Sequence, residues 1–266
     1  MLTILAAKLI LAPVLIALVT LAGRRWGPEA AGWLAGIPIT GGPILLFIAI
    51  EQGEPFAAST ATAALFGLVA FCAHCLAFAW VASRLRWWAA LPVGWAAYFA
   101  VGWPLTRWHP PTLIAALAGG AALIATALLL PRPRSAHVHV AAPWWELLLR
   151  MAAIAAVVLT VTGLAHWLGV GWSGVLTVFP TGATVLGAFA LVQGGTDAVA
   201  RTLRGMQYGM LCLTGFFATL AFGLERYGIA ATFSLAMAVA LAGQALTLVI
   251  VRLARRLTVN ARPAAS

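Results

Sequence analysis

Charged residues are scarce in this chain of 266 residues, at 8% of the total, and only six residues are acidic. A soluble domain carries about 25% charged residues, because it must cover a water-facing surface. The deficit excludes an ordinary soluble fold. The chain is instead 63% hydrophobic, with a mean hydropathy of +1.00. A bilayer suits this composition, because each spanning helix needs roughly 20 apolar residues.

Cysteine is also rare, and Cys72, Cys75 and Cys212 all lie inside apolar runs. They are expected to be small buried hydrophobes and not a disulfide framework. No P-loop motif occurs, and no soluble segment is long enough for an ATPase domain. The formal net charge of +10 does not predict nucleic-acid binding, because the cations lie in short connections between apolar runs. The sequence predicts no cofactor and no metal centre.

Nine apolar runs with short connections predict an all-α, polytopic membrane protein with about nine transmembrane helices. The first run lacks a basic start and a cleavage site, so we expect a retained helix and not a signal peptide. The predicted spans are roughly 2–22, 31–50, 56–82, 87–106, 111–130, 147–168, 171–193, 200–222 and 228–251.

The basic residues alternate between the two sets of connections. Thirteen of the 16 Lys and Arg residues fall in one set and three in the other. Because translocation disfavours cationic loops, the richer side is predicted to be cytoplasmic. The N-terminus is then outside and the C-terminus inside. The excess of Arg over Lys and the abundant Ala favour a high-GC bacterial source, and hence the bacterial inner membrane. The poorer set holds Lys8, Arg107 and Arg226; the richer set holds Arg24, Arg25, Arg84, Arg86, Arg132, Arg134, Arg150, Arg201, Arg204, Arg252, Arg255, Arg256 and Arg262.

The second and seventh spans resemble each other. A shift of 141 residues aligns Thr40 with Thr181 and Gly53 with Gly194, and Pro38 aligns with Pro180 after a gap of one residue. Five spans separate the two copies, and an odd number inverts the second copy. We therefore predict two inverted four-helix repeats plus a linking helix. The predicted divisions are 1–110, a first membrane repeat; 111–146, a linking helix and loop; 147–251, the second repeat; and 252–266, a basic cytoplasmic tail.

The unit also resembles an uncharacterised family of bacterial membrane proteins about half as long. The shared pattern is G-x-x-x-G-x-P-x-T, here Gly32 to Thr40, followed by the EQG turn that ends at Gly53. The resemblance covers roughly 23–80 and, more weakly, 169–222. It implies a duplicated membrane protein of unknown activity. The plan of four helices, one helix and four helices is similar in organisation to drug/metabolite-type transporters.

Helix-breaking residues crowd the middle of the second and seventh spans. Pro removes a backbone donor and Gly lowers helix propensity. Broken backbone at membrane depth must be paired inside the protein or line a wet cavity. We expect these breaks to bind an ion or a polar substrate, although close helix packing through small residues is the alternative. The predicted site residues are Pro38, Thr40, Gly41, Gly42, Pro180, Thr181 and Gly182, with Gln207, Gln244 and His74 as further lining.

Acidic residues lie only near predicted interfaces, so no central carboxylate is available to carry a proton. The turns after the two broken spans place Glu51 and Gln52 outside and Gln193 and Asp197 inside, where they are candidates for gating. Helix capping and contact with water are the alternatives. Asp197 and Arg201, four residues apart, are expected to form a surface helix pair. His74 follows Cys72 by two residues, which suits a hydrogen-bonded neutral histidine better than a metal site.

The leading function is a secondary transporter of a small solute or ion that works by alternating access. A flippase for lipids or lipid carriers is the alternative within transport. A non-catalytic membrane accessory subunit is a third candidate and a membrane enzyme a fourth, but no nucleophile with its base stands out. The expected partners are membrane lipid and a small-molecule or ionic substrate, with a homodimer left open.

The cation asymmetry makes a testable prediction. Reporter fusions at Met1 and Ser266 should report opposite sides of the membrane, with Ser266 cytoplasmic. Both ends on one side would rule out nine spans.

Overall fold

The described chain is almost entirely helical. The computed structural model describes residues 37–108, 111–133 and 144–260, together with isolated positions before residue 37. Those three ranges contain no strand, so the all-α class is confirmed. The predicted first span, the start of the second, the loop 134–143 and the tail after 260 lie outside the continuous ranges. The helices are α3 (Gly41–Gln52), α4 (Glu54–Ala82), α5 (Trp87–Leu105), α6 (Thr112–Leu129), α7 (Trp144–Thr177) and α8 (Thr181–Asn260).

Three glycines divide the two longest helices. Gly169 breaks α7 at φ 69°, and Gly195 and Gly228 break α8 at φ 67° and 75°. The resulting segments are 144–168 and 170–177 in α7, and 181–194, 196–227 and 229–260 in α8. These bounds lie within a few residues of the spans predicted from hydropathy, except in the tail, where the helix extends further.

Three stretches of the described chain are long and apolar enough to cross a membrane. They are Glu54–Ala82, Thr112–Leu129 and Leu159–Thr247, the last of which contains the breaks at Gly195 and Gly228. α3 is apolar but shorter. Length and composition thus make the protein compatible with membrane insertion.

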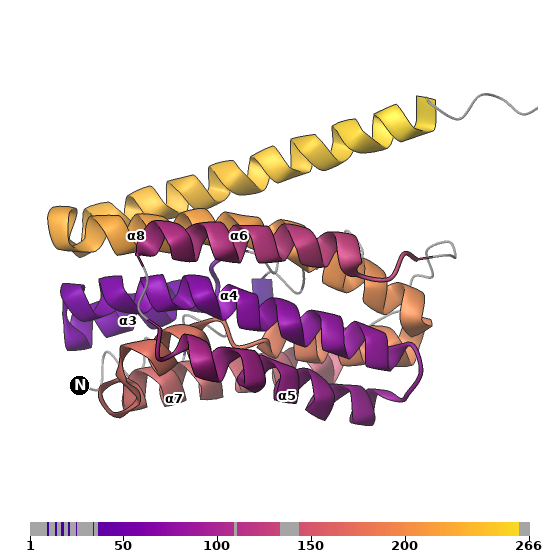
Figure 1. Ribbon diagram of the computed structural model, residues 1–266, viewed down its shortest axis with the longest axis horizontal. Coiled ribbons are helices and arrows are strands. Elements are labelled where there is room, and N and C mark those ends of the chain that lie inside the picture. The colour runs from indigo at the N-terminus through magenta and orange to yellow at the C-terminus, as the bar shows by residue number, and fades with distance from the viewer. Residues whose placement is uncertain are drawn as a thin grey trace, which may run out of the picture.

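The helices run along a common direction between two ends of a bundle (Figure 1). At one end, named the Gly53 end, the turn at Gly228 lies beside Glu54: a Cβ at Gly228 would lie 3.6 Å from Glu54 Oε1. At the other, named the Arg204 end, the Arg204 guanidinium donates hydrogen bonds to the carbonyl oxygens of Leu130 and Pro131, at 2.6 and 3.3 Å. Arg204 thereby caps the last carbonyls of α6.

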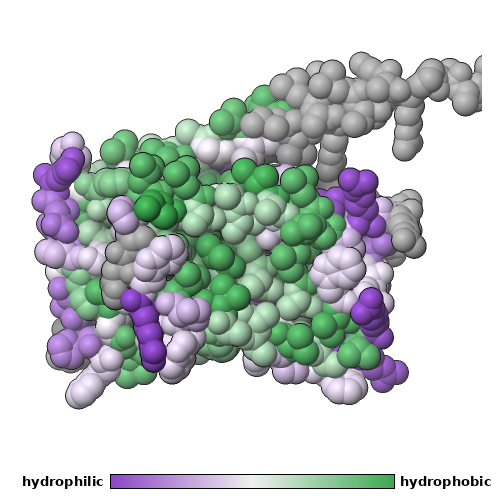
Figure 2. All heavy atoms as spheres, viewed as in Figure 1, coloured by the Kyte–Doolittle hydropathy of each residue, from purple (hydrophilic) through white to green (hydrophobic). Residues whose placement is uncertain are grey.

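Charge is confined to these ends. In 37–133 and 181–247 every Asp, Glu and Arg lies in or beside a turn at one end. Figure 2 shows the same division on the surface, with hydrophilic atoms at both ends and a hydrophobic band between them. In 37–133 and 181–247 the Gly53 end carries Arg107 and Arg226, and the Arg204 end carries Arg84, Arg86, Arg132, Arg201 and Arg204.

α4 is the centre of the bundle and packs against α5, α6, α7 and α8. Most of its side chains are buried. Neighbouring helices approach it closely through small residues: a Cβ at Gly119 would lie 2.7 Å from the Leu65 carbonyl oxygen, and one at Gly174 would lie 2.6 Å from that of Thr60. Close approach through small residues is how helices associate where burial from water cannot drive packing.

A methyl group at Gly174 should therefore destabilise the protein. We expect Gly174→Ala to cost about 1–3 kcal/mol, as overpacking does, despite a gain in helix propensity. Gly163→Ala is the matched control, because nothing lies within 4 Å of its Cβ position. Thermal unfolding in detergent measures both, and equal midpoints would contradict the close approach.

Candidate functional site

Two helix breaks lie at Pro38 and Pro180. Proline has no N–H and clashes with the preceding turn, so an α-helix cannot continue through it unchanged. In the first break, the N–H of Ile39 donates to the carbonyl oxygen of Ile37 at 2.7 Å, across Pro38. In the second, the N–H of Thr181 donates to that of Phe179 at the same distance, across Pro180.

The flanking hydrogen bonds repeat as well, always 142 residues apart. Ile37 donates to Leu34 and Phe179 to Leu176, both at 3.1 Å. The helices restart with bonds back to the prolines, of 3.0 Å from Gly42 to Pro38 and 2.8 Å from Thr184 to Pro180. Backbone geometry thus matches the two prolines directly, without the gap that a shift of 141 requires. Thr40 corresponds to Gly182 and not to Thr181.

Each break has backbone donors that bond to no other residue in the described part of the chain. No hydrogen bond joins the N–H of Thr40 or Gly41 to another described residue, and the same holds for Gly182 and Ala183. These four groups belong to the first turns of two helix segments, where N–H groups have no partner inside the helix.

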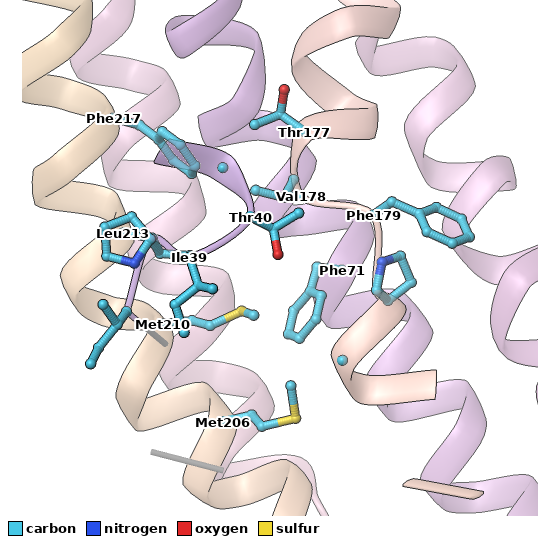
Figure 3. A pocket seen from close by; sticks show the side chains of 15 residues that line it. Ile39, Thr40, Phe71, Thr177, Val178, Phe179, Met206, Met210, Leu213 and Phe217 are labelled. Carbon is cyan, nitrogen blue, oxygen red and sulfur yellow. The ribbon is translucent and has the colours of Figure 1, made fainter. Parts of the chain in front are cut away.

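The two breaks line one cavity of about 60 Å³ (Figure 3). Since a water molecule occupies about 30 Å³ in the liquid, the cavity has room for one or two waters or a small ion. Its wall consists of Ile37, Pro38, Ile39, Thr40 and Gly41 from the first break; Thr177, Val178, Phe179, Pro180 and Gly182 from the second; and Phe71, Met206, Met210, Leu213 and Phe217 from α4 and α8.

The cavity lies about halfway between the ends. α3 runs from it to the Gly53 end over 12 residues, about 18 Å at 1.5 Å per residue. The segment 181–194 runs from it to the Arg204 end over 14 residues, about 21 Å. The two segments leave the cavity toward opposite ends.

The side chains around the cavity are mostly apolar. Only two have a hydroxyl, and no charged side chain is among the 15 lining residues. Figure 3 shows the hydroxyl of Thr40 directed into the cavity. The hydroxyl of Thr177 points away and donates to the Ser173 carbonyl oxygen at 2.7 Å. A ligand would therefore meet Thr40 Oγ1 and backbone groups.

Five of the predicted site residues line the cavity, and the others lie outside its wall. Pro38, Thr40, Gly41, Pro180 and Gly182 line it. Gly42, Thr181, Gln207, Gln244 and His74 do not.

The residues outside the wall are buried in their own surroundings. Thr181 is 7% exposed, and its hydroxyl has no partner among the described residues. Gln207 is fully buried and accepts a hydrogen bond from Cys72 Sγ at 3.5 Å. The His74 ring, also fully buried, packs against Gly94 of α5, whose Cβ would lie 2.9 Å from its Nδ1. Their part in binding remains a prediction.

The predicted gating residues lie at the two ends. Glu51 and Gln52 close α3 at the Gly53 end, where Glu51 is exposed. Gln193 and Asp197 flank Gly195, and both are partly exposed. The expectation of a surface pair at Asp197 and Arg201 is wrong for Arg201, which is only 6% exposed. The helix position puts its guanidinium inside the bundle, which residue spacing alone does not reveal.

Sequence reasoning missed the side chains of α4 and α8 that complete the wall. Met206, Met210, Leu213 and Phe217 follow one another at intervals of four, three and four residues, which places them on one helix face. That spacing was available in the sequence. Their position opposite two proline breaks was not, because it depends on how distant segments pack.

No known protein family, curated protein or solved structure matches this chain.

The contact between the breaks is testable by cross-linking. A Cβ at Gly41 would lie 3.4 Å from Thr177 Cγ2. The Thr177 Cβ is one bond from that Cγ2, which puts the two Cβ atoms near the separation of about 3.5–4.5 Å that suits a disulfide. We therefore expect Gly41→Cys combined with Thr177→Cys to form that bond under mild oxidation. Peptide mapping by mass spectrometry detects it. Ile50→Cys with Thr177→Cys is the control, since Ile50 is two and a half turns further along α3. If no disulfide forms in the first pair, the two breaks are not in contact and the cavity between them is contradicted.

Proposed function

We propose that the chain is a secondary transporter of a small solute or ion that works by alternating access at the cavity. One observation carries the proposal. Two helix breaks with the same hydrogen bonding line one cavity, and the helix segments that begin there run to opposite ends of the bundle. Paired interrupted helices around a central site are typical of transporters built from inverted repeats.

The offset of 142 extends beyond the breaks, which supports the inverted repeats. Gly53 ends α3 at φ 90°, ψ 165°, and Gly195 ends the segment 181–194 at φ 67°, ψ −164°. Such angles are open to glycine and rare for other residues. Arg86 and Gly228, also 142 apart, both precede the next helix with similar ψ, 161° and 173°, but their φ angles differ in sign, −72° and 75°. α6 then lies between the copies as the linking helix.

We further propose that the chain spans the bacterial inner membrane nine times, with the Arg204 end on the cytoplasmic side. The lengths of α3 and of 181–194, about 18 and 21 Å, add up to nearly the 40–45 Å thickness of a bilayer with its headgroup regions. This agreement supports a cavity near the midplane. Among the cations of 37–133 and 181–247, five at the Arg204 end against two at the Gly53 end agree with the positive-inside rule.

Close packing through small residues accounts for Gly119 and Gly174, but it does not account for the cavity. Small residues favour close approach, and Gly41 lies against Phe217 and Thr177 in that way, but a cavity remains beside this contact. In the proposed cycle, α3 and the segment 181–194 move in turn, and each opens the cavity toward one end. Glu51 and Gln52 on one side and Gln193 and Asp197 on the other lie where these movements would open or close the mouths.

Proteoliposome uptake tests this function. The solutes to try are those that change between deletion and overexpressing cells in an unbiased metabolite comparison. Gly182→Leu should abolish uptake, because the first atom of its side chain has room, 3.6 Å from Met206 Cε, and the rest must occupy the cavity. Thr40→Val should reduce uptake about fivefold, since one neutral hydrogen bond is worth about 1 kcal/mol. Thr181→Val should reduce it less, because Thr181 is outside the wall.

Gly163→Leu is the matched control and should transport at the normal rate, because its Cβ faces open space. Normal uptake by Gly182→Leu would place the site elsewhere. Movement of labelled lipid without solute uptake would favour the flippase, and absence of both would favour the accessory subunit.

A further inference from the structure

His74 is an ionisable side chain deep inside the bundle. Its exposed fraction is 0%. Neither ring nitrogen has a hydrogen-bond partner of acceptable geometry among the described residues, although the Gly94 backbone lies beside the ring. Buried polar groups in proteins are nearly always hydrogen-bonded, and ionisable side chains at membrane depth are costly and mark functional positions. The unmade hydrogen bonds of His74 therefore need an explanation.

Packing alone does not explain a histidine at this place. At the offset of 142 residues that relates the two breaks, the residue is Phe216, which is also fully buried. Each ring packs against a phenylalanine: His74 lies on Phe78, with ring centroids 6.1 Å apart, and Phe216 lies on Phe217, at 5.6 Å. A hydrocarbon ring thus fills the corresponding place without the cost of burying two polar nitrogens. What histidine adds is the capacity to bind a proton near neutral pH.

His74 lies on α4 between the cavity and the Arg204 end. It comes one turn after Phe71, which lines the cavity, and eight residues before Ala82, the last residue of α4, about 12 Å at 1.5 Å per residue. In the proposed cycle, the segment 181–194 moves to open the cavity toward this same end. His74 is therefore on the side of the cavity that this movement would open.

Two contacts hold the segment 181–194 against the surroundings of the histidine. A Cβ at Gly187 would lie 2.8 Å from Phe78 Cε1, and Trp95 Nε1 donates to Thr184 Oγ1 at 3.1 Å. Phe78 stacks on the histidine ring, and Trp95 follows the glycine beside that ring. Departure of the segment would therefore uncover this region to water entering from the Arg204 end.

No described charge balances a protonated His74. Burial and the Gly94 backbone act on the ring, and no charged side chain is among these influences. The titratable side chain of α5 is Tyr98, whose hydroxyl is already bonded to the Val175 carbonyl oxygen, and α6 and 181–194 have none. An imidazolium in the packed bundle would be a buried, unpaired charge, which is strongly unfavourable. The titratable side chains near His74 on α4 and at the start of 196–227 are Cys72, Cys75, Asp197, Arg201 and Arg204.

We infer that His74 binds a proton when the segment 181–194 moves away from α4 and α5, and that it releases this proton before the segment returns. The ring takes the proton from water on a nitrogen lone pair and becomes an imidazolium, which water can solvate and the packed bundle cannot. Acid therefore favours the arrangement that is open toward the Arg204 end. The inference rests on the movement proposed for alternating access, but not on transport itself.

A distance between two spin labels measures the opening in the purified protein. Val192 on the segment and Leu85 in the turn after α4 are 64% and 57% exposed, both at the Arg204 end. Labels on Val192→Cys and Leu85→Cys should show a short and a long distance. A solvated histidine titrates near pH 6.5. The long-to-short ratio should be constant from about pH 8 to about pH 7 and rise by up to about tenfold per pH unit below that, as linkage to one proton requires.

Three variants and one control assign this pH dependence. His74→Phe should abolish it, because a phenylalanine ring is tolerated at the corresponding buried position. His74→Gln should abolish it as well, because an amide keeps the polarity without titrating. His166→Gln is the matched control and should keep it, since His166 is exposed on α7. The chain without added cysteines should take up no label, because its own three are buried.

Nitrogen-15 NMR of histidine-labelled protein reads the proton directly. One signal, absent in His74→Phe, should change from neutral imidazole to imidazolium over the pH range in which the long distance grows. A His74 ring that stays neutral down to about pH 5 overturns the inference.

The outcomes separate the inference from the proposed function. A ratio that is independent of pH, or that depends on pH equally in His74→Phe, overturns the inference and leaves the movement standing. A single distance at every pH also overturns it, and proteoliposome uptake then decides the proposed function separately. A ratio that depends on pH through His74, in a protein that carries no solute, would support the inference and contradict transport.

Discussion

Every backbone polar group in an apolar environment needs a partner, and the two proline breaks are where this protein departs from that rule. Elsewhere in the described helices most backbone groups find partners within the helix, although Pro92 and Pro104 each remove one donor from α5. At Pro38 and Pro180 the chain forms a short bond across the proline and begins a new helix. The first turn of each new helix then faces the other break across a cavity. The position of the cavity and the proposed function both depend on this local failure of helical pairing.

Packing on α4 keeps the breaks in place. Gly67 lets Val178 of the second break lie directly on α4, since a Cβ there would also meet the Val175 carbonyl oxygen at 3.1 Å. The Tyr98 hydroxyl, from α5, donates to the same carbonyl at 2.5 Å. The end of 170–177 is thus fixed by a close contact on one side and a hydrogen bond on the other, so the cavity has at least one rigid wall.

Much of this could be predicted from sequence, because hydropathy and proline act locally. The helix bounds follow from apolar runs and glycines, and the breaks follow from proline chemistry. The offset of the hydrogen bonds did not follow: similar residues in the two spans suggested a shift of 141, whereas the hydrogen bonds around the two prolines recur at 142. The residues that line the cavity from α4 and α8 could not be predicted either, since Phe71 and Met206 are ordinary apolar residues in sequence. The burial of Arg201 likewise depends on how helices from distant parts of the chain pack.

Pro43 distinguishes two breaks whose printed backbone hydrogen bonds match. It stands where the second copy has Val185, 142 residues later, and it has no N–H to offer the carbonyl oxygen of Ile39 four residues before it. The first turn of α3 is therefore held by one backbone bond fewer than a regular helix allows. Two orientations of a twofold-related pair have equal energy only if the pair is identical. Under the proposed alternating access, Pro43 is one difference that would favour one orientation over the other.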